Sequence, residues 1–520
     1  MKLRYSIPFL FMSVIACADL QAQSIDDALT FSREDNAASA RIKGLGNAQT
    51  ALGGDISSIN GNPAGLGFFG RSDISITFNY LQNANKVNYL GTNTSTNKGN
   101  FGIDQAGVVF QFPTSGRSGW QNFNVGLSYN KTQNFNNTRN YEGVNNNSTI
   151  VHALTDLMSN NTGFEDDFYN SYIVDEYGVP GKSGYFPIAV ENEDKKQYNE
   201  HIIKGNRSKT AVAFGANYNN LFYIGASLGI TSFRYDKNTQ FIENGWTKNA
   251  TEVAVDNPTS DFLNPANVAS DYLNASYELF DNFSQVTEGS GVDLKLGMIY
   301  KPAQDWNIGV TINTPTWITI KEDTRAYTDV NYYEDETSDH PFPDDMQYAS
   351  NYYDSGEDYS LTTPWKFALG ASKFFSRGLL TADVEFVDYS TMKYGDVSTN
   401  YYSNSTFDGI NSDLKNTYKS AVNFKIGGEY LINNALSARA GFNYFGNPYK
   451  NADDKNLSGS LGLGVKLSNS LYLDLAVYHQ VNSYKEAAYI LDEEFWNLPS
   501  PVASIDHKRT NFALTFGAKF

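Results

Sequence analysis

The chain ends in the segment NFALTFGAKF, from Asn511 to Phe520. Apolar side chains alternate with small or polar ones along this segment, at Phe512, Leu514, Phe516, Ala518 and Phe520. Successive side chains of a β-strand point to opposite faces of the sheet, so a period of two indicates a strand with one apolar face. The segment therefore predicts an amphipathic strand that finishes on an aromatic residue.

The same alternation recurs along the chain, for example at Ile74, Ile76, Phe78 and Tyr80. Strands of about this length can cross a bilayer when they are tilted. In all, the pattern predicts fourteen strands, near residues 72–82, 103–112, 121–131, 207–219, 221–234, 289–301, 304–315, 362–374, 378–389, 417–432, 435–446, 456–467, 470–481 and 509–520.

The connections between these strands alternate between short and longer ones. The short ones carry turn residues, as in Asn219-Asn220 and Asn433-Asn434. The longer ones are predicted as loops, at 83–102, 132–206, 235–288, 316–361, 390–416, 447–455 and 482–508. This alternation predicts an all-β fold: a transmembrane antiparallel up-and-down β-barrel of about fourteen strands over residues 72–520, with long extracellular loops. Closure also leaves no unpaired sheet edge in lipid.

Composition narrows the class of protein. The 520 residues include 35 Tyr and 34 Phe, which suit pleated surfaces, and carry a net charge of −18. A negative surface repels phosphate groups, so no nucleic-acid partner is expected. Cys17 is the one cysteine, which excludes a disulfide or a thiolate metal site within one chain. We expect no cofactor and no metal.

Residues 1–22 have the pattern of a secretory signal peptide. Lys2 and Arg4 precede the apolar run Ile7–Ala16, and Leu20-Gln21-Ala22 resembles a cleavage site. The alternative is that Val14–Cys17 is a lipobox and Cys17 a lipidated N-terminus. A signal peptide followed by a β-barrel predicts that the protein is located in the outer membrane of a Gram-negative bacterium. The alternating terminal strand, with Phe512, Leu514, Phe516 and Phe520, resembles the signal that the barrel-assembly machinery reads.

Residues 23–71 differ from the rest and are rich in Ala, Gly and Asn, with short helical patches around 37–43 and 47–52. A barrel of fourteen strands is too wide to be filled by its own side chains. We therefore expect this segment to be a plug, or hatch, inside the barrel. Its charged side chains are expected to pair with charges of the wall; they are Arg33, Glu34, Arg41, Lys43 and Asp55.

Charged residues also occupy the inward positions of the predicted strands. Five are acidic and five basic, a balance that predicts pairing or hydration, because an isolated charge in a dry lumen is costly. They brace a plug or solvate the lumen, or else they form a charged permeation track. This candidate network comprises Asp293, Lys295, Lys366, Asp383, Glu385, Lys425, Glu429, Arg439, Asp474 and Lys519.

Ala40–Phe69 resembles the N-terminal hatch of the FadL/TodX outer-membrane transport family. The most specific piece is Asn62-Pro63-Ala64-Gly65-Leu66, and the run with Gly44, Gly46 and Ala48 also fits. Arg439–Tyr449 resembles the late strand and following loop of that family. With the strand number and the terminal Phe, the resemblance covers essentially the whole mature chain.

The resemblance implies a monomeric plugged barrel that carries hydrophobic molecules passively inward, such as long-chain fatty acids or aromatic hydrocarbons. The ligand would reach a pocket that touches the hatch and leave sideways where a wall strand is distorted. The third strand, with Gly126, is the place to look for that distortion. Loop aromatics, at Phe164, Phe168, Tyr169 and 185–188, either bind ligand or only pack the loops. A polar-solute porin and a secretion-system scaffold are the alternative functions.

An enzyme is not expected. Of the five histidines only His479 falls in a predicted strand, and no H-E-x-x-H motif occurs. The expected partners are a hydrophobic small molecule, outer-membrane lipid and the barrel-assembly machinery.

Overall fold

The structure is a computed structural model that describes residues 24–35, 37–115, 118–160, 168–334, 351–397, 407–451 and 455–520. The predicted signal peptide with Cys17, and also Phe164 and His340, lie outside the described residues.

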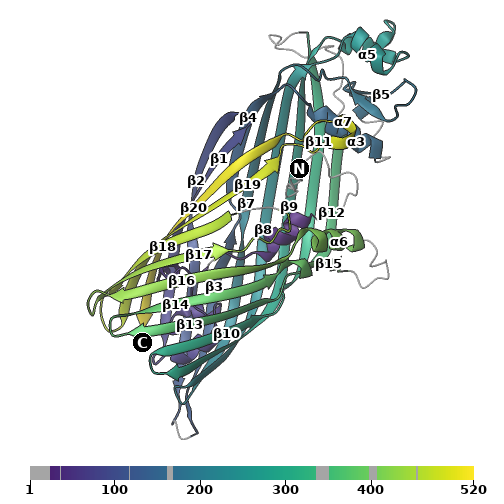
Figure 1. Cartoon of the computed structure of the whole chain (residues 1–520). Helices are drawn as coiled ribbons and strands as arrows, with labels where there is room; N and C mark the ends of the chain where they lie inside the picture. Colours follow the sequence, from purple (N-terminus) through teal and green to yellow (C-terminus); the bar gives the residue numbers. More distant parts are fainter. Residues whose placement is uncertain are drawn as a thin grey trace.

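Within these residues, eighteen strands form one antiparallel sheet that closes on itself. Closure occurs where β1 (Asp73–Tyr89) pairs with both β2 (Thr92–Pro113) and the last strand, β20 (Val502–Lys519) (Figure 1). Seven further strands each span the wall alone: β7 (Lys195–Tyr218), β8 (Phe222–Trp246), β9 (Ser276–Ala303), β16 (Ser420–Leu431), β17 (Leu436–Phe445), β18 (Lys455–Lys466) and β19 (Leu471–Ala487).

The other eight strands lie end to end in pairs, and each pair makes one stave of the wall. The pairs are β3 (Trp120–Asn134) with β4 (Asn137–Asn145), β10 (Trp306–Asn313) with β11 (Trp317–Tyr333), β12 (Asn351–Thr362) with β13 (Lys366–Phe375), and β14 (Gly378–Asp388) with β15 (Lys393–Asp396). The described wall therefore has fourteen staves, and the predicted fourteen-stranded antiparallel barrel is confirmed.

An apolar band surrounds the outside of the barrel. On the stave of β10 and β11, the exposed side chains of Ile308 and Ile312 lie between two exposed tryptophans, Trp306 and Trp317. Aromatic residues at both edges of an apolar band are typical of barrels that sit in lipid. None of the helices in the described part of the chain has the length and apolarity of a membrane-spanning helix. The outward apolar faces place the strands in a membrane, as predicted.

The strands continue far beyond this band. β7, β8 and β9 contain 24, 25 and 28 residues. The predicted loops 83–102, 132–206, 235–288, 316–361 and 482–508 are too long, because wall strands continue into each of them. Above the lipid the outer face needs no apolar side chains, so the alternating pattern disappears while the backbone pairing persists. Arg234 and Asp236, for example, are outward neighbours on β8 and form an ion pair.

Prolines divide two of the paired staves. Pro315 separates β10 from β11, and Pro364 separates β12 from β13. Proline has no N–H to donate to a ladder. The neighbouring threonines replace the lost ladder contacts, since Thr316 N donates to Thr363 Oγ1 at 2.8 Å and Thr363 N donates to Thr316 O at 3.1 Å.

A cap lies over the far end of the extended strands (Figure 1). It contains α3 (Ile150–Asn160), β5 (Val174–Glu176), β6 (Tyr185–Pro187), α5 (Ala250–Asp256), η4 (Asp261–Leu263), η5 (Val268–Tyr272) and α7 (Glu493–Trp496). Phe168, Phe186 and Ile188 are buried in its hydrophobic core, whereas Tyr169 is exposed. Most of the loop aromatics therefore pack the cap. Beside the wall, η6 (Tyr389–Thr391) precedes β15 and α6 (Asp408–Thr417) precedes β16.

The segment before β1 lies inside the barrel, the purple part of Figure 1. It contains α1 (Ile25–Ser32), α2 (Ala40–Gly44), η2 (Ile56–Ile59) and η3 (Pro63–Phe68). A polar residue caps each start: the Ser24, Ser39, Asp55 and Asn62 side chains accept backbone N–H groups. α1 packs against the wall and α6, while the other three helices lie deeper in the lumen.

Candidate functional site

Glycines of the wall allow the backbone of the plug to approach closely. A Cβ atom at any of five wall positions would lie 2.3 Å or less from a plug atom. Real Cβ atoms do not approach other heavy atoms so closely, so each position requires glycine unless the plug moves. The five are Gly225 against Pro63, Gly297 against Asn62, Gly309 against Thr50, Gly427 against Leu45 and Gly441 against Gly46.

The Asn62–Leu66 part of the hatch motif forms the base of the plug. The Asn62 side chain accepts from Ala64 N at 3.1 Å and donates to Thr50 O at 2.6 Å. Pro63 is the first residue of η3, where a missing N–H costs nothing. Ala64 and Leu66 are fully buried, and a Cβ at Gly65 would lie 2.5 Å from Ser58 Oγ.

The earlier part of the motif contacts β17 and β18. Gly44 lies opposite Gly462, and Gly46 has a φ of +64°, which favours glycine. Ser460 Oγ donates a hydrogen bond to Gly44 O at 3.2 Å and accepts one from Gly46 N at 3.1 Å. Ala48 is fully buried. Both parts of the motif therefore serve close packing against the wall.

One set of the predicted lumen charges lies around Arg439. Its guanidinium is 2.6 Å from Glu429 Oε2 and 2.5 Å from Asp474 Oδ1. Arg41 of the plug joins the same Glu429 at 3.3 Å. Glu429, Arg439 and Asp474 were predicted on inward positions and Arg41 on the plug, and the structure brings these four groups into one cluster.

A second set surrounds Glu34 of the plug. Three wall cations contact this carboxylate: Lys209 at 3.0 Å, Lys366 at 3.4 Å and Arg207 at 3.5 Å. Lys209 also contacts Asp293 at 3.0 Å. Arg207 and Lys209 are not among the predicted lumen charges, although both lie on inward positions of the predicted strand 207–219, a parity that marks them as lumen residues.

The remaining charges contact the plug or one another. Asp383 accepts Gln49 N at 2.8 Å and Thr50 N at 2.9 Å, while Glu385 is 3.7 Å from Lys425. Lys295 donates to Asn60 O, and Lys43 of the plug pairs with Asp104. Lys519 lies apart, over the ring of Tyr472 at 5.8 Å. Of the plug charges expected to meet the wall, Asp55 instead accepts from Ser39 and Ser57 within the plug.

A cavity of about 360 Å³ lies on the plug. Its lining reaches from Lys131 and Asn134 on the third stave to Gly446 and Pro448 in the link between β17 and β18. Charged and amide side chains make up most of that lining, and apolar ones are few. The described lumen thus offers a polar chamber directly above the hatch.

The third stave is irregular where it meets this cavity. The ladder between β2 and β3 ends at Gln105 and Asn130. The pairing of β3 with β7 shifts register between Lys131 and Gln133, and Thr132 O accepts a hydrogen bond from Asp35 N of the plug at 2.5 Å.

Beyond this point side chains replace the backbone ladder between the second and third staves. Asn134 Nδ2 donates to Asn100 Oδ1 at 3.3 Å, and Thr96 Oγ1 donates to Thr138 O at 2.7 Å. Gly126 itself is paired on both sides, with Val109 and Ala213. The distortion of the third stave therefore begins several residues beyond Gly126, the position predicted for it.

Above the cavity the lumen is filled by polar side chains and the cap. Glu243 accepts hydrogen bonds from Ile150 N at 3.1 Å, Gln197 Nε2 at 2.5 Å and Tyr277 OH at 2.8 Å. These contacts join α3 of the cap to three strands of the wall, so they close the far end of the barrel.

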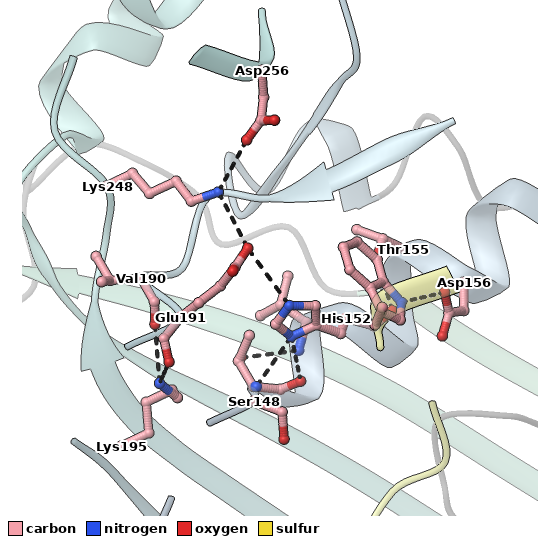
Figure 2. Close-up of polar contacts among 12 residues, drawn as sticks. Ser148, His152, Thr155, Asp156, Val190, Glu191, Lys195, Lys248 and Asp256 are labelled. Carbon is pink, nitrogen blue, oxygen red and sulfur yellow. Dashed lines mark hydrogen bonds and ion pairs between the residues drawn. The ribbon is translucent and has the colours of Figure 1, made fainter. Parts of the chain in front are cut away.

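Ion pairs continue this closure into the cap. Buried His152 has its Nε2 3.8 Å from Glu191 Oε1, and Lys248 lies 3.7 Å from Glu191 and 3.6 Å from Asp256. Figure 2 shows Lys248 between these two carboxylates. Ser148 lies near the same histidine, but its hydroxyl group bonds to Tyr489 at 2.9 Å. The chain of contacts ties α3 to α5 and thereby holds the cap together.

A further buried layer contains Arg139, His201 and Glu486. Arg139 Nη2 is 2.7 Å and His201 Nε2 is 3.1 Å from Glu486. The expectation that only His479 lies in a strand is wrong, since His201 belongs to β7 and His507 to β20. Both lie in the extension above the apolar band, where the sequence lacks the pattern that marks a strand.

These histidines predict a loss of stability in mild acid. Burial, together with the charge of Arg139, lowers the pKa of His201 to about 4, and burial lowers the pKa of His507 to about 3. Between about pH 6.5 and 4 the unfolded chain therefore binds protons that the folded chain does not, so stability falls as pH falls through this window. We expect about 2 kcal/mol per histidine to be lost from pH 7 to 5.

Thermal unfolding of the detergent-solubilised barrel at both pH values measures this loss. His201→Gln should remove its share of the pH dependence, whereas His479→Gln, which changes an exposed side chain, should leave the dependence intact. An equal pH dependence in His201→Gln would contradict the prediction.

Comparison with known proteins gives a likeness of fold. No protein-family model matches the chain, and no curated protein matches it in sequence. The solved structure of the toluene transporter TodX of P. putida is 14% identical, with 93% of this chain and 98% of that chain covered and a TM-score of 0.53. A Pseudomonas aeruginosa FadL homologue is 16% identical over 94% of this chain and 98% of its own, with a TM-score of 0.49.

The likeness to TodX covers nearly the whole of both chains. The predicted resemblance to the FadL/TodX barrel is thus confirmed at the level of the fold. The apolar band and the closed wall agree with the predicted place in an outer membrane.

Proposed function

We propose that this chain is an outer-membrane channel for the passive uptake of hydrophobic molecules. The solute leaves the outer solution beside the link between β17 and β18, passes the cavity on the plug without being held there, and exits sideways between β2 and β3. One observation carries this route: the cavity reaches from Pro448 to Lys131, where the backbone ladder of the wall is interrupted.

The closed far end supports a sideways path. Glu243 and the cap block the axis of the barrel above the cavity, and the plug fills it below. TodX, which shares the fold, is a toluene transporter. A solute that leaves through the wall enters lipid directly, which suits a hydrophobic molecule. The polar lining of the cavity favours a second candidate function, a channel for polar solutes.

Crosslinking the irregular stave tests the sideways exit. The side chains of Asn100 and Asn134 are in hydrogen-bond contact across the interruption. In the variant Asn100→Cys/Asn134→Cys, a short bis-maleimide should tie the two staves together. We expect the uptake of labelled oleate and toluene by cells to fall at least tenfold on crosslinking.

The matched control crosslinks the same two strands where their ladder is intact, in Phe110→Cys/Val125→Cys. This pair should form the crosslink without loss of uptake. If the crosslinked Asn100/Asn134 variant still takes up both solutes at the wild-type rate, the exit lies elsewhere. If neither solute is taken up by the wild type, the hydrophobic channel itself is contradicted.

A further inference from the structure

The cavity on the plug has an excess of cations without acidic partners. Seven lysine and arginine residues line it, and four of them form ion pairs with Asp104, Glu34, Glu385 and Asp35. Arg33, Lys131 and Lys295 have no acidic group within 4.0 Å among the described residues.

The acidic groups of the lining, in contrast, are all engaged. Four form the ion pairs above, and the fifth, Asp383, accepts two backbone N–H groups of the plug at 2.8 and 2.9 Å. No described carboxylate of the lining therefore forms a direct ion pair with these three cations, and the seven cations of the lining outnumber its five carboxylates, which favours an anion.

Lys131 is the most suitable partner for that anion. Its side chain is nine-tenths buried, and among the described residues its Nζ donates only to Asn79 Oδ1, at 3.3 Å. An ammonium group has three N–H donors, so two remain for a ligand. Lys295 likewise donates to a single backbone oxygen, that of Asn60.

Polar atoms around the cavity also lack partners. Five lining residues carry at least one buried nitrogen or oxygen atom with no hydrogen bond among the described residues: Asn47, Gln133, Asn313, Asp383 and His507. Buried polar groups are nearly always hydrogen-bonded in folded proteins. Such a concentration at one cavity indicates a ligand, or ordered water, that supplies the missing bonds.

We infer that this cavity is a binding site for a small hydroxylated carboxylic acid, of the chemical class of the sugar acids. Lys131 pairs with the carboxylate, Arg33 and Lys295 add positive potential, and the amide side chains bond the hydroxyl groups. The volume of about 360 Å³ lies within the range of small-molecule sites, roughly 300–1,000 Å³, but the usual apolar lining is missing. An apolar solute would leave these polar groups unpaired, so it would cross the cavity without binding tightly there.

Binding to the purified full-length barrel in detergent tests the inference without any transport step. Equilibrium dialysis measures the binding of three labelled probes: galacturonate, galactose and decanoate. We expect galacturonate to bind at least tenfold more tightly than galactose, which lacks the carboxylate, and than decanoate, which lacks the hydroxyl groups. Lys131→Met should weaken galacturonate binding at least tenfold.

The controls separate a lost site from a lost fold. Lys86→Met, which removes an exposed lysine from β1, should bind like the wild type, and Lys131→Arg should retain most of the affinity. Heat-modifiable migration on SDS gels verifies that each variant is a folded barrel. Equal binding of galactose, tighter binding of decanoate, no binding of galacturonate, or full affinity in Lys131→Met would each overturn the inference. A failure of the proposed hydrophobic uptake would leave this binding result unchanged.

Discussion

Gly441→Val should displace the plug from the wall of the barrel. A Cβ atom at Gly441 would lie 2.2 Å from Gly46 N and 2.5 Å from Leu45 C. Both are backbone atoms of the plug, so no side-chain rotation can relieve the overlap. Overpacking a tight interior typically costs about 1–3 kcal/mol and sometimes more, and we expect the upper end here.

Limited trypsin digestion measures the displacement, because Arg41 and Lys43 lie in the adjoining helix and are protected by contacts with the wall. Cleavage there should be at least tenfold faster in Gly441→Val. The matched control is Gly459→Val on the neighbouring strand β18, where nothing lies within 4 Å of an added Cβ. Equal protection of the two variants would contradict the close docking of the plug.

Glu34→Ala should open the barrel to ions. The carboxylate of Glu34 joins the plug to Lys209, Lys366 and Arg207, and its removal leaves three cations facing one another with Asp293 as the nearest acid of the wall. Removing one partner from a buried ion pair costs roughly 3–5 kcal/mol, because the remaining charge is left uncompensated. The plug should therefore detach at this point, and single-channel conductance in planar bilayers should rise severalfold.

Two controls accompany this measurement. Glu142→Ala removes an exposed carboxylate from β4 and should keep the wild-type conductance. Glu34→Ala/Lys366→Met removes one of the unpaired cations as well and should restore part of the closure, which gives the coupling between the two residues. If Glu34→Ala conducts like the wild type, the charge contacts do not hold the plug.

Together these contacts describe how the plug is held. Glycines of five wall strands leave room for the plug backbone to approach closely. Ion pairs of Glu34 and Asp35 attach the segment between α1 and α2 to the wall. The same charges border the cavity, so a solute that binds there changes the groups on which docking depends. Whether the ten predicted lumen charges also guide a solute stays a prediction.

Local patterns carried much of the prediction. Alternation at Ile74–Tyr80 and at Phe512–Phe520 indicated which faces meet lipid, because lipid selects apolar side chains at every second position. The same parity placed Asp383 and Arg439 in the lumen. Where the wall leaves the membrane this selection ends, and the strands that contain His201 and most of the upper wall could not be told from loops.

The sequence by itself determined the number of membrane strands, their inward and outward faces, and the close-packing motif of the plug, since each depends on residues near one another in the chain. Only the tertiary structure decided which charges form ion pairs, for example Glu34 with Lys209 and Lys366. It also decided where the backbone ladder beside Lys131 ends and which side chains line the cavity, most of them polar. These properties depend on the register of fourteen staves and on closure between β1 and β20, which bring together residues hundreds of positions apart.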